Sequence, residues 1–240
     1  MTETKSDLQA VIFDCDGVLV DTEPLHYRAF QEVLGPLGLG HDYECYRERY
    51  IGFDDRDAFL YAFKEAGRQL GHDSLQRLVE AKAAALSELI ARGAPGFPGV
   101  VELVKELREE GVALAVASGA LRREVDAFLS SLGLGESFLA IVTADDVRKS
   151  KPDPETYLLA IELLRTHCGQ EPFEPRNCVA IEDTPSGIHS AKTAGLAVIA
   201  VTNSFPEDRL TGADKVIGSL SDLSFQAMVD LLEKRRQEER

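Results

Sequence analysis

Short apolar runs alternate with amphipathic segments along most of this 240-residue chain. Runs of this kind predict buried strands over residues 8–13, 112–117, 138–143, 178–181 and 197–201. The segments between them space their apolar residues as helices do, over residues 100–110, 122–132, 154–165 and 185–194. Strands that alternate with helices are typical of a parallel sheet covered by helices on both faces. The pattern therefore predicts an α/β fold with a Rossmann-like core.

Residues 23–92 interrupt this alternation, because they carry helical patterns and no convincing buried strand. The interruption ends in residues 92–99, which are rich in glycine and proline and are typical of a hinge or linker. We therefore expect a Rossmann-like core over residues 1–22 and 95–240, with an inserted α-helical cap over residues 23–94. The charged end of the chain, residues 233–240, is expected to fray into solvent.

The first predicted strand ends in acidic residues. Asp14 and Asp16 follow its apolar run, and Gly17 comes next. The two-residue repeat of a strand would turn both carboxylates to the same side. Like charges held that close are costly unless a cation or a shared proton offsets them. A solvated acidic turn before a helix would give the same short pattern, so the other strand ends decide between the two interpretations.

Each of the next two strands is followed by residues suited to a phosphate group. Ser118 and Gly119 follow the second strand, where a hydroxyl and free backbone amides can hold a phosphate oxygen or simply cap a helix. Lys151 follows the third strand, and Pro152 and Pro154 stiffen the backbone beside it. Lys151 would therefore act as a fixed positive charge at the sheet edge.

A second acidic pair, Glu182 and Asp183, follows the fourth strand. The carboxyl ends of parallel strands meet at one edge of a sheet, where ligands bind in folds of this class. Four acids and one lysine at that edge suit Mg²⁺, which prefers carboxylate, carbonyl and water oxygens and also binds substrate phosphate. The sequence thus predicts a metal site formed by Asp14, Asp16, Glu182 and Asp183.

Composition narrows the choice of partners. The formal net charge of −15 argues against binding to nucleic acid or to an anionic membrane surface, since both need basic patches. No apolar stretch is long enough to span a membrane, and the first seven residues lack the layout of a signal peptide, so we expect a cytoplasmic protein. The four cysteines are scattered without a CxxC pair, which indicates neither a disulfide scaffold nor a zinc site.

The four strand-end motifs, in this order, resemble the haloacid dehalogenase superfamily, specifically its phosphatase and phosphomutase branch with a helical cap after the first strand. The resemblance covers nearly the whole chain. It implies that Asp14 is the nucleophile that forms an aspartyl phosphate, and that Asp16 is the general acid and then the base. It also implies that the backbone carbonyl of Asp16 contacts Mg²⁺.

The same resemblance implies that Ser118, Gly119 and Lys151 bind phosphate and that Glu182 and Asp183 are the metal-binding pair. The second aspartate and the double acid belong to the Mg²⁺-dependent phosphoryl branch, so dehalogenation is disfavoured.

Three cap residues are candidates for substrate contacts. The segment over residues 22–27 resembles a cap hinge, where His26 either couples cap closure to the acid/base or is a locally hydrogen-bonded histidine. Residues 50–57 resemble a cap specificity loop, from which Arg56 could reach a distal phosphate or hydroxyl. Lys82 is a second candidate on a predicted cap helix. Arg56 and Lys82 are each also consistent with solvated surface residues.

These observations predict an Mg²⁺-dependent phosphatase that acts on a small phosphorylated metabolite, with a sugar phosphate expected. The alternative is a phosphomutase like β-phosphoglucomutase, in which His26, Arg56 and Lys82 would hold a second phosphate. A third interpretation is a non-catalytic phosphometabolite-binding protein, which the loss of Asp14 or Asp16 would favour, and both are present. We expect a monomer or a weak dimer.

Overall fold

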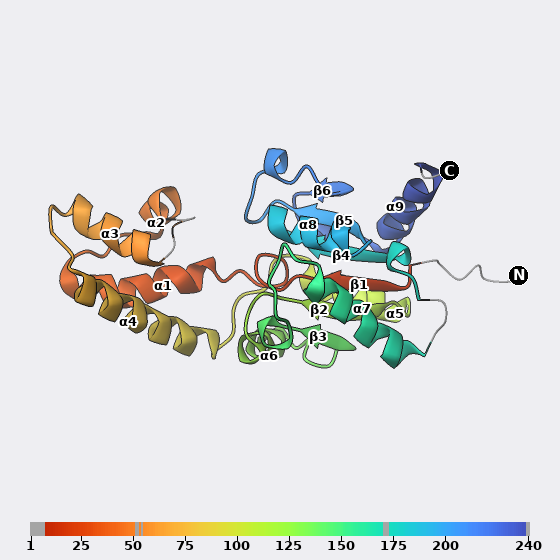
Figure 1. Cartoon of the computed structure of the whole chain (residues 1–240), viewed down its shortest axis with the longest axis horizontal. Helices are drawn as coiled ribbons and strands as arrows, with labels where there is room; N and C mark the ends of the chain where they lie inside the picture. Colours follow the sequence, from red (N-terminus) through yellow and green to blue (C-terminus); the bar gives the residue numbers. More distant parts are fainter. Residues whose placement is uncertain (1–7, 51–52, 54, 170–172, 239–240) are drawn as a thin grey trace, which may run out of the picture. The chain divides into compact units, whose positions relative to one another are not determined.

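The structure, a computed structural model, describes residues 8–50, 53, 55–169 and 173–238 (Figure 1). The chain forms two compact units. The first comprises Met1–Asp21 and Pro95–Arg240, and the second comprises Thr22–Ala94. Asp21 and Pro95 meet within the first unit, where the backbone N–H of Asp21 donates to the carbonyl of Pro95 at 2.9 Å.

The first unit contains a parallel sheet of six strands in the order β3-β2-β1-β4-β5-β6. The strands are β1 (Ala10–Phe13), β2 (Ala113–Ala117), β3 (Ala140–Val142), β4 (Cys178–Glu182), β5 (Ala197–Val201) and β6 (Lys215–Ile217). The first five confirm the strands predicted from the apolar runs. The sequence pattern did not predict β6, a three-residue edge strand whose first two residues are only partly buried. The α/β fold class is confirmed.

Helices cover the sheet. They are α5 (Val100–Glu109), α6 (Arg122–Ser131), α7 (Glu155–Cys168), α8 (Pro185–Thr193) and α9 (Phe225–Glu238). Short 3-10 helices occur at η2 (Ala144–Asp146), η3 (Pro175–Asn177), η4 (Glu207–Arg209) and η5 (Leu220–Asp222). The expectation that residues 233–240 fray is wrong as far as Glu238, because α9 continues to that residue.

The two central strands fix the position of the site. β1 lies between β2 and β4, with Ile12 opposite Ala115 and Ala180. Small strand residues on one face leave room for α7 and α8, which pack there through residues such as Tyr157 and Ile188. Strand periodicity turns the alternate residues of the same strands to the opposite face. All four residues of β1 are buried, so the chain emerges from the sheet directly at Asp14.

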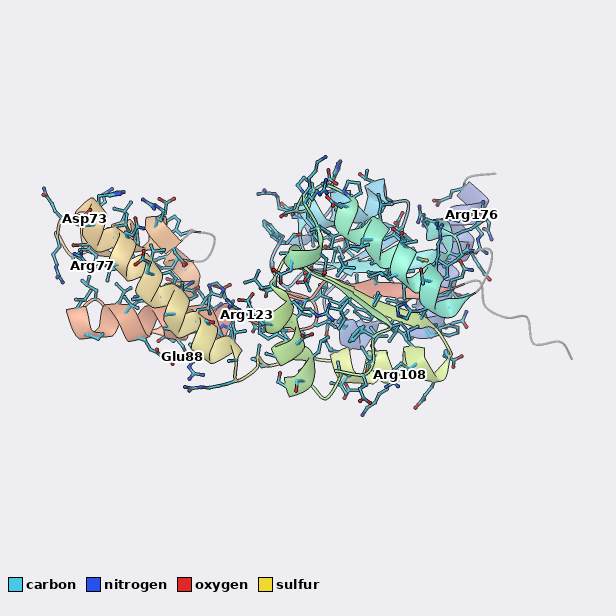
Figure 2. All side chains as sticks on the ribbon, turned by 60° about the horizontal axis from the view of Figure 1, so that its bottom comes forward. Asp73, Arg77, Glu88, Arg108, Arg123 and Arg176 are labelled. Atoms are coloured by element: carbon cyan, nitrogen blue, oxygen red, sulfur yellow. The ribbon has the colours of Figure 1, made fainter. Side chains whose placement is uncertain are left out.

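The second unit is helical in the part that the structure describes. Its elements are α1 (Glu23–Leu34), η1 (Gly35–Leu37), α2 (Tyr43–Arg49), α3 (Asp55–Glu65) and α4 (His72–Ile90). Aromatic residues dominate its core, including Phe30, Tyr46, Phe59 and Phe63. Asp73, Arg77 and Glu88 lie exposed along α4 (Figure 2).

All four cysteines are free thiols, and Cys15 and Cys178 are buried. Among the helices of the described residues, none has the length and apolar character needed to cross a membrane.

Candidate functional site

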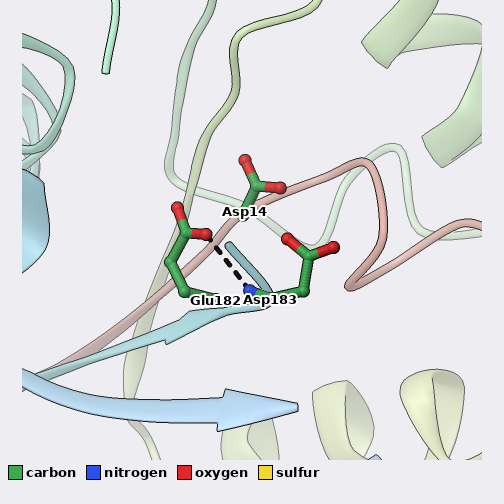
Figure 3. A group of neighbouring side chains, drawn as sticks. All are labelled: Asp14, Glu182 and Asp183. Carbon is green, nitrogen blue, oxygen red and sulfur yellow. Dashed lines mark hydrogen bonds between the residues drawn. The ribbon is translucent and has the colours of Figure 1, made fainter. Parts of the chain in front are cut away.

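Three carboxylates meet where β1 and β4 end (Figure 3). Asp14 follows β1, Glu182 is the last residue of β4, and Asp183 comes next. Among the residues that the structure describes, these three offer carboxylate oxygens that all lie within 4.8 Å of one another. Each is buried, with an exposed fraction of 7% or less. The parallel pairing of β1 and β4 therefore brings together acids that are far apart in the sequence.

Lys151 supplies the positive charge of this cluster. Its Nζ donates to Asp14 Oδ1 and to Glu182 Oε1, both at 2.6 Å. Its side chain is only 11% exposed, and its Nζ lies 5.0 Å from the centre of the Tyr157 ring. Burial alone would lower the pKa of Lys151, but the charges of Asp14 and Glu182 outweigh it, so the pKa is raised. Lys151 is thus a fixed cation, as its proline-stiffened surroundings predicted.

Protein donors already surround Glu182. Its two oxygens accept five hydrogen bonds: Lys151 and Tyr157 donate to Oε1, and the Asp183 N–H, the Thr184 N–H and the Thr184 hydroxyl donate to Oε2. The first turn of α8 fits closely beneath it, because a Cβ on Gly187 would lie 1.9 Å from Glu182 Oε1. Glu182 is therefore held rigidly, and Lys151 is anchored to it.

Asp183 is held differently. Its Oδ2 accepts a hydrogen bond from the Ser204 hydroxyl, while its Oδ1 is buried without a hydrogen-bond partner in the described structure. Burial raises the pKa of Asp183 to about 7, with the Ser204 hydrogen bond opposing and Glu182 and Asp16 adding to the rise. A buried carboxylate oxygen without a donor is costly unless a ligand or a proton satisfies it.

The cluster as a whole carries more negative than positive charge. Burial raises the pKa of Asp14 well above its usual range; Lys151 opposes this rise, whereas Glu182 and Asp183 add to it. Burial is the largest cause of this rise, so the ionised form of Asp14 is disfavoured even with Lys151 beside it. The donor set consists of hard carboxylate oxygens, and Asp183 presents an unsatisfied one. These features fit a hard divalent cation such as Mg²⁺.

Asp16 stands apart from the buried group. β1 ends at Phe13, so Asp14 and Asp16 both lie in the loop beyond it, and Asp16 is exposed. Strand periodicity therefore does not align the two carboxylates, contrary to what we expected from the sequence, because the strand has ended before Asp14. The charge of Asp16 nonetheless contributes to the raised pKa of Asp183, so the two carboxylates lie within electrostatic reach.

Ser118 and Gly119 lie at the adjacent strand end. Ser118 follows β2, is buried, and accepts a hydrogen bond of 3.0 Å from the Ala120 N–H. Helix α6 begins only at Arg122, with Leu121 as its N-cap. Ser118 and Gly119 are thus not the cap of that helix, and the simple capping interpretation is wrong.

In the second unit, Lys82 is the buried centre of a polar group. It is 1% exposed, and its Nζ donates to Asp55 Oδ1 at 2.7 Å and contacts His26 Nδ1 at 2.9 Å. The solvated interpretation of Lys82 and the local interpretation of His26 are therefore both wrong. Because an ammonium group only donates, His26 accepts at Nδ1 and its proton lies on Nε2. Burial, with the charge of Lys82, lowers the pKa of His26 to about 4.

Arg56 differs from Lys82. It is the second residue of α3 and its side chain is exposed, which agrees with a solvated surface residue. Residues 51, 52 and 54 of the expected specificity loop lie outside the described residues, so the loop stays a prediction. The structure brings His26 and Lys82 together and does not add Arg56 to that group.

Four residues of these two groups were not predicted from the sequence pattern. Tyr157 lies on α7 at a position that the helical pattern assigns to the core, and Asp55 was part of the expected cap loop without a role of its own. Asn203 and Ser204 follow β5 and contact the loop after Asp14 and the Asp183 carboxylate, respectively. A signal for the last two existed, because polar residues at a further strand end belong to the same sheet edge.

Comparison with known proteins places this site in a family. The family described as haloacid dehalogenase-like hydrolase matches residues 11–201. A phosphorylated carbohydrates phosphatase of Thermotoga maritima is 34% identical over 193 residues, which cover 79% of this chain and 82% of the relative. β-Phosphoglucomutase of Bacillus subtilis is 29% identical over 233 residues, which cover 95% of this chain and 97% of the relative.

Solved structures agree with this placement. The crystal structure of CbbY from Rhodobacter sphaeroides in complex with phosphate aligns with a TM-score of 0.67 and 29% identity, covering 93% of this chain and 99% of that one. The family match extends from within β1 to the end of β5, and so includes all four strand ends that carry the buried acids, the lysine and the serine. The chain belongs to the haloacid dehalogenase-like hydrolase family.

Proposed function

We propose that this protein is an Mg²⁺-dependent phosphatase that hydrolyses a small phosphorylated metabolite, with a sugar phosphate as the substrate class. One observation carries the proposal: buried Asp14 lies beside Asp183, whose Oδ1 has no donor, and both belong to a buried cluster with one lysine. The relatives named for phosphorylated carbohydrates and for phosphoglucomutase support the substrate class.

Asp14, Glu182 and Asp183 would hold the metal, together with the backbone carbonyl of Asp16. When bound, Mg²⁺ supplies positive charge that offsets the repulsion between the Asp14 carboxylate and an anionic phosphate. Lys151 adds a second positive charge, which Glu182 keeps in place through a hydrogen bond of 2.6 Å. Ser118 and the backbone at Gly119 would hold further phosphate oxygens.

The reaction would proceed in two displacements. A carboxylate oxygen of Asp14 attacks phosphorus while the ester P–O bond breaks, and Asp16 donates its proton to the leaving oxygen. Water then attacks phosphorus while Asp16, now ionised, accepts a proton from it; the Asp14 O–P bond breaks and inorganic phosphate leaves. The exposure of Asp16 suits this role, because its proton must exchange between leaving group and water.

The phosphomutase alternative needs a second phosphate site. Lys82, the buried cation considered for it, is already paired with Asp55 at 2.7 Å, and this pairing favours a phosphatase. Product analysis separates the two activities. A panel of sugar phosphates incubated with protein and Mg²⁺ should yield inorganic phosphate and dephosphorylated sugar, and chelation with EDTA should stop the release. Formation of an isomeric sugar phosphate without phosphate release would show a phosphomutase instead.

A further inference from the structure

A fifth strand end contributes to the site. β5 (Ala197–Val201) lies beside β4, so the residues that follow β5 emerge next to Asp183. The chain there is fixed to the sheet, because the Thr202 N–H donates to the Ile217 carbonyl of β6 at 3.1 Å. The next two residues, Asn203 and Ser204, each donate a side-chain hydrogen bond into the site.

Asn203 holds the loop that follows the two aspartates. Its Nδ2 donates to the Gly17 carbonyl at 2.7 Å. Gly17 adopts a φ of +81°, and a Cβ at this position would lie 1.9 Å from Asp183 Oδ2. The Gly17 N–H also donates to the Val20 carbonyl at 3.0 Å, which closes the loop. Asn203 therefore keeps the backbone that carries Asp16 packed against the Asp183 carboxylate.

Ser204 fixes the other side of that contact. Its hydroxyl donates to Asp183 Oδ2, the same oxygen that Gly17 approaches. With Oδ2 held in this way, the remaining oxygen, Oδ1, is the one without a donor. The carboxylate thus has a fixed rotation, and its unsatisfied oxygen stays available to a ligand.

We propose that Asn203 and Ser204 are positioning residues that set the metal affinity of the site, by fixing the Asp183 carboxylate and the Asp16 loop relative to each other. This inference rests on the proposed function only in taking Asp183 as a metal ligand. Neither residue would touch the reacting phosphorus. Loss of either side chain should therefore weaken metal binding.

Titration calorimetry with MgCl₂ alone tests this, on wild type and on Ser204→Ala, Asn203→Ala and Ser204→Thr. A hydrogen bond to a charged group is worth enough to change affinity about tenfold. Ser204→Ala should raise the Mg²⁺ Kd by about that factor. Asn203→Ala loses a bond to the neutral Gly17 carbonyl and should raise the Mg²⁺ Kd by about fivefold. Ser204→Thr keeps the hydroxyl and should bind Mg²⁺ about as tightly as wild type. Ser219→Ala is the matched control, because it removes a serine hydroxyl that accepts only a local bond from the Ser221 N–H.

Activity gives a second readout. In the two alanine variants the Mg²⁺ concentration for half-maximal activity should rise in parallel with the Mg²⁺ Kd. Circular dichroism melting of the metal-free proteins controls for folding. Mg²⁺ affinities within twofold of wild type for both alanine variants would overturn the inference, as would wild type that binds no Mg²⁺. A different result would contradict the proposed function alone: wild type binds Mg²⁺ and both alanine variants bind Mg²⁺ more weakly, but no phosphate is released.

Discussion

The hydroxyl of Tyr157 donates a hydrogen bond of 2.8 Å to Glu182 Oε1, the same oxygen that accepts from Lys151. Tyr157 is fully buried on α7, so this bond links the core of the sheet to the charged cluster. Burial raises the pKa of Tyr157 well above its usual range, and the charge of Glu182 adds to the rise, so the hydroxyl keeps its proton at neutral pH. The position of Lys151 therefore depends on Tyr157, which the sequence pattern indicates only as a hydrophobic core residue.

Tyr157→Phe should lower the free energy of unfolding by about 2 kcal/mol, because a buried carboxylate loses a donor. It should also lower kcat/KM moderately, since Lys151 keeps its bond to Glu182. Urea unfolding and steady-state kinetics measure both. Tyr27→Phe is a suitable control, because its hydroxyl donates to the neutral carbonyl of His41 and its loss should cost about half as much. Equal costs for the two variants would contradict the proposed anchoring.

The metal-free protein should lose stability as the pH rises. The pKa of Asp183 is about 7 in the folded state and close to 3.8 when unfolded, so the folded state binds the proton more tightly. The contribution of Asp183 to the free energy of unfolding is complete below the unfolded pKa and is lost as the pH rises through 7. The loss is on the order of 2 kcal/mol between about pH 5 and pH 8. Urea unfolding in EDTA at both pH values checks this, with Asp183→Asn as the control that cannot titrate. Parallel pH profiles for the two proteins would argue against it.

Lys82 and Arg56 should differ sharply in their effect on stability. Lys82→Met keeps the apolar bulk but leaves Asp55 without its cation and His26 Nδ1 without its donor, which should cost on the order of 2 kcal/mol. Arg56→Ala alters an exposed side chain and should change stability by less than about 0.5 kcal/mol. Thermal unfolding measures both, and Lys82→Met combined with Asp55→Asn should regain part of the loss. Equal melting temperatures for Lys82→Met and wild type would contradict the buried ion pair.

Asp16→Asn should remove proton transfer without removing the backbone carbonyl. We expect a loss of roughly 10²–10⁴-fold in kcat for an alkyl phosphate, because its leaving oxygen needs a proton. The loss should be much smaller for p-nitrophenyl phosphate, whose leaving group departs without one. Kinetics on both substrates at saturating Mg²⁺ provide the measurement. Equal losses for the two substrates would rule out Asp16 as the acid of the first step.

The arrangement of the main site residues could be predicted from the sequence because it follows from the topology of the sheet. Asp14, Ser118, Lys151 and Glu182 each follow or end an apolar run, and parallel strands bring such positions to one edge. Their exact environments depend on neighbours that periodicity cannot supply. Nothing in the pattern distinguishes Glu182, which five protein donors surround, from Asp183, which keeps an oxygen without a donor.

Other features escaped the pattern for physical reasons. Lys82 occupies a core position of α4, seven residues from both Leu75 and Leu89, although a charged side chain is typical of an exposed position. Its burial depends on Asp55 and His26, which lie on other helices and have no local signature. β6 has only three residues, too few for a periodic signal, and as the edge strand of the described sheet it pairs with β5 alone.

Asp14→Asn tests the central claim most directly. Asparagine has nearly the same volume but is a poor nucleophile, so the variant should fold like wild type and still contain Lys151 and Asp183 in place. Phosphate release from the best sugar phosphate, measured at saturating Mg²⁺ alongside far-ultraviolet circular dichroism, should fall below about a hundredth of the wild-type rate. A folded Asp14→Asn protein that turns over faster than this would show that Asp14 does not carry the phosphoryl group.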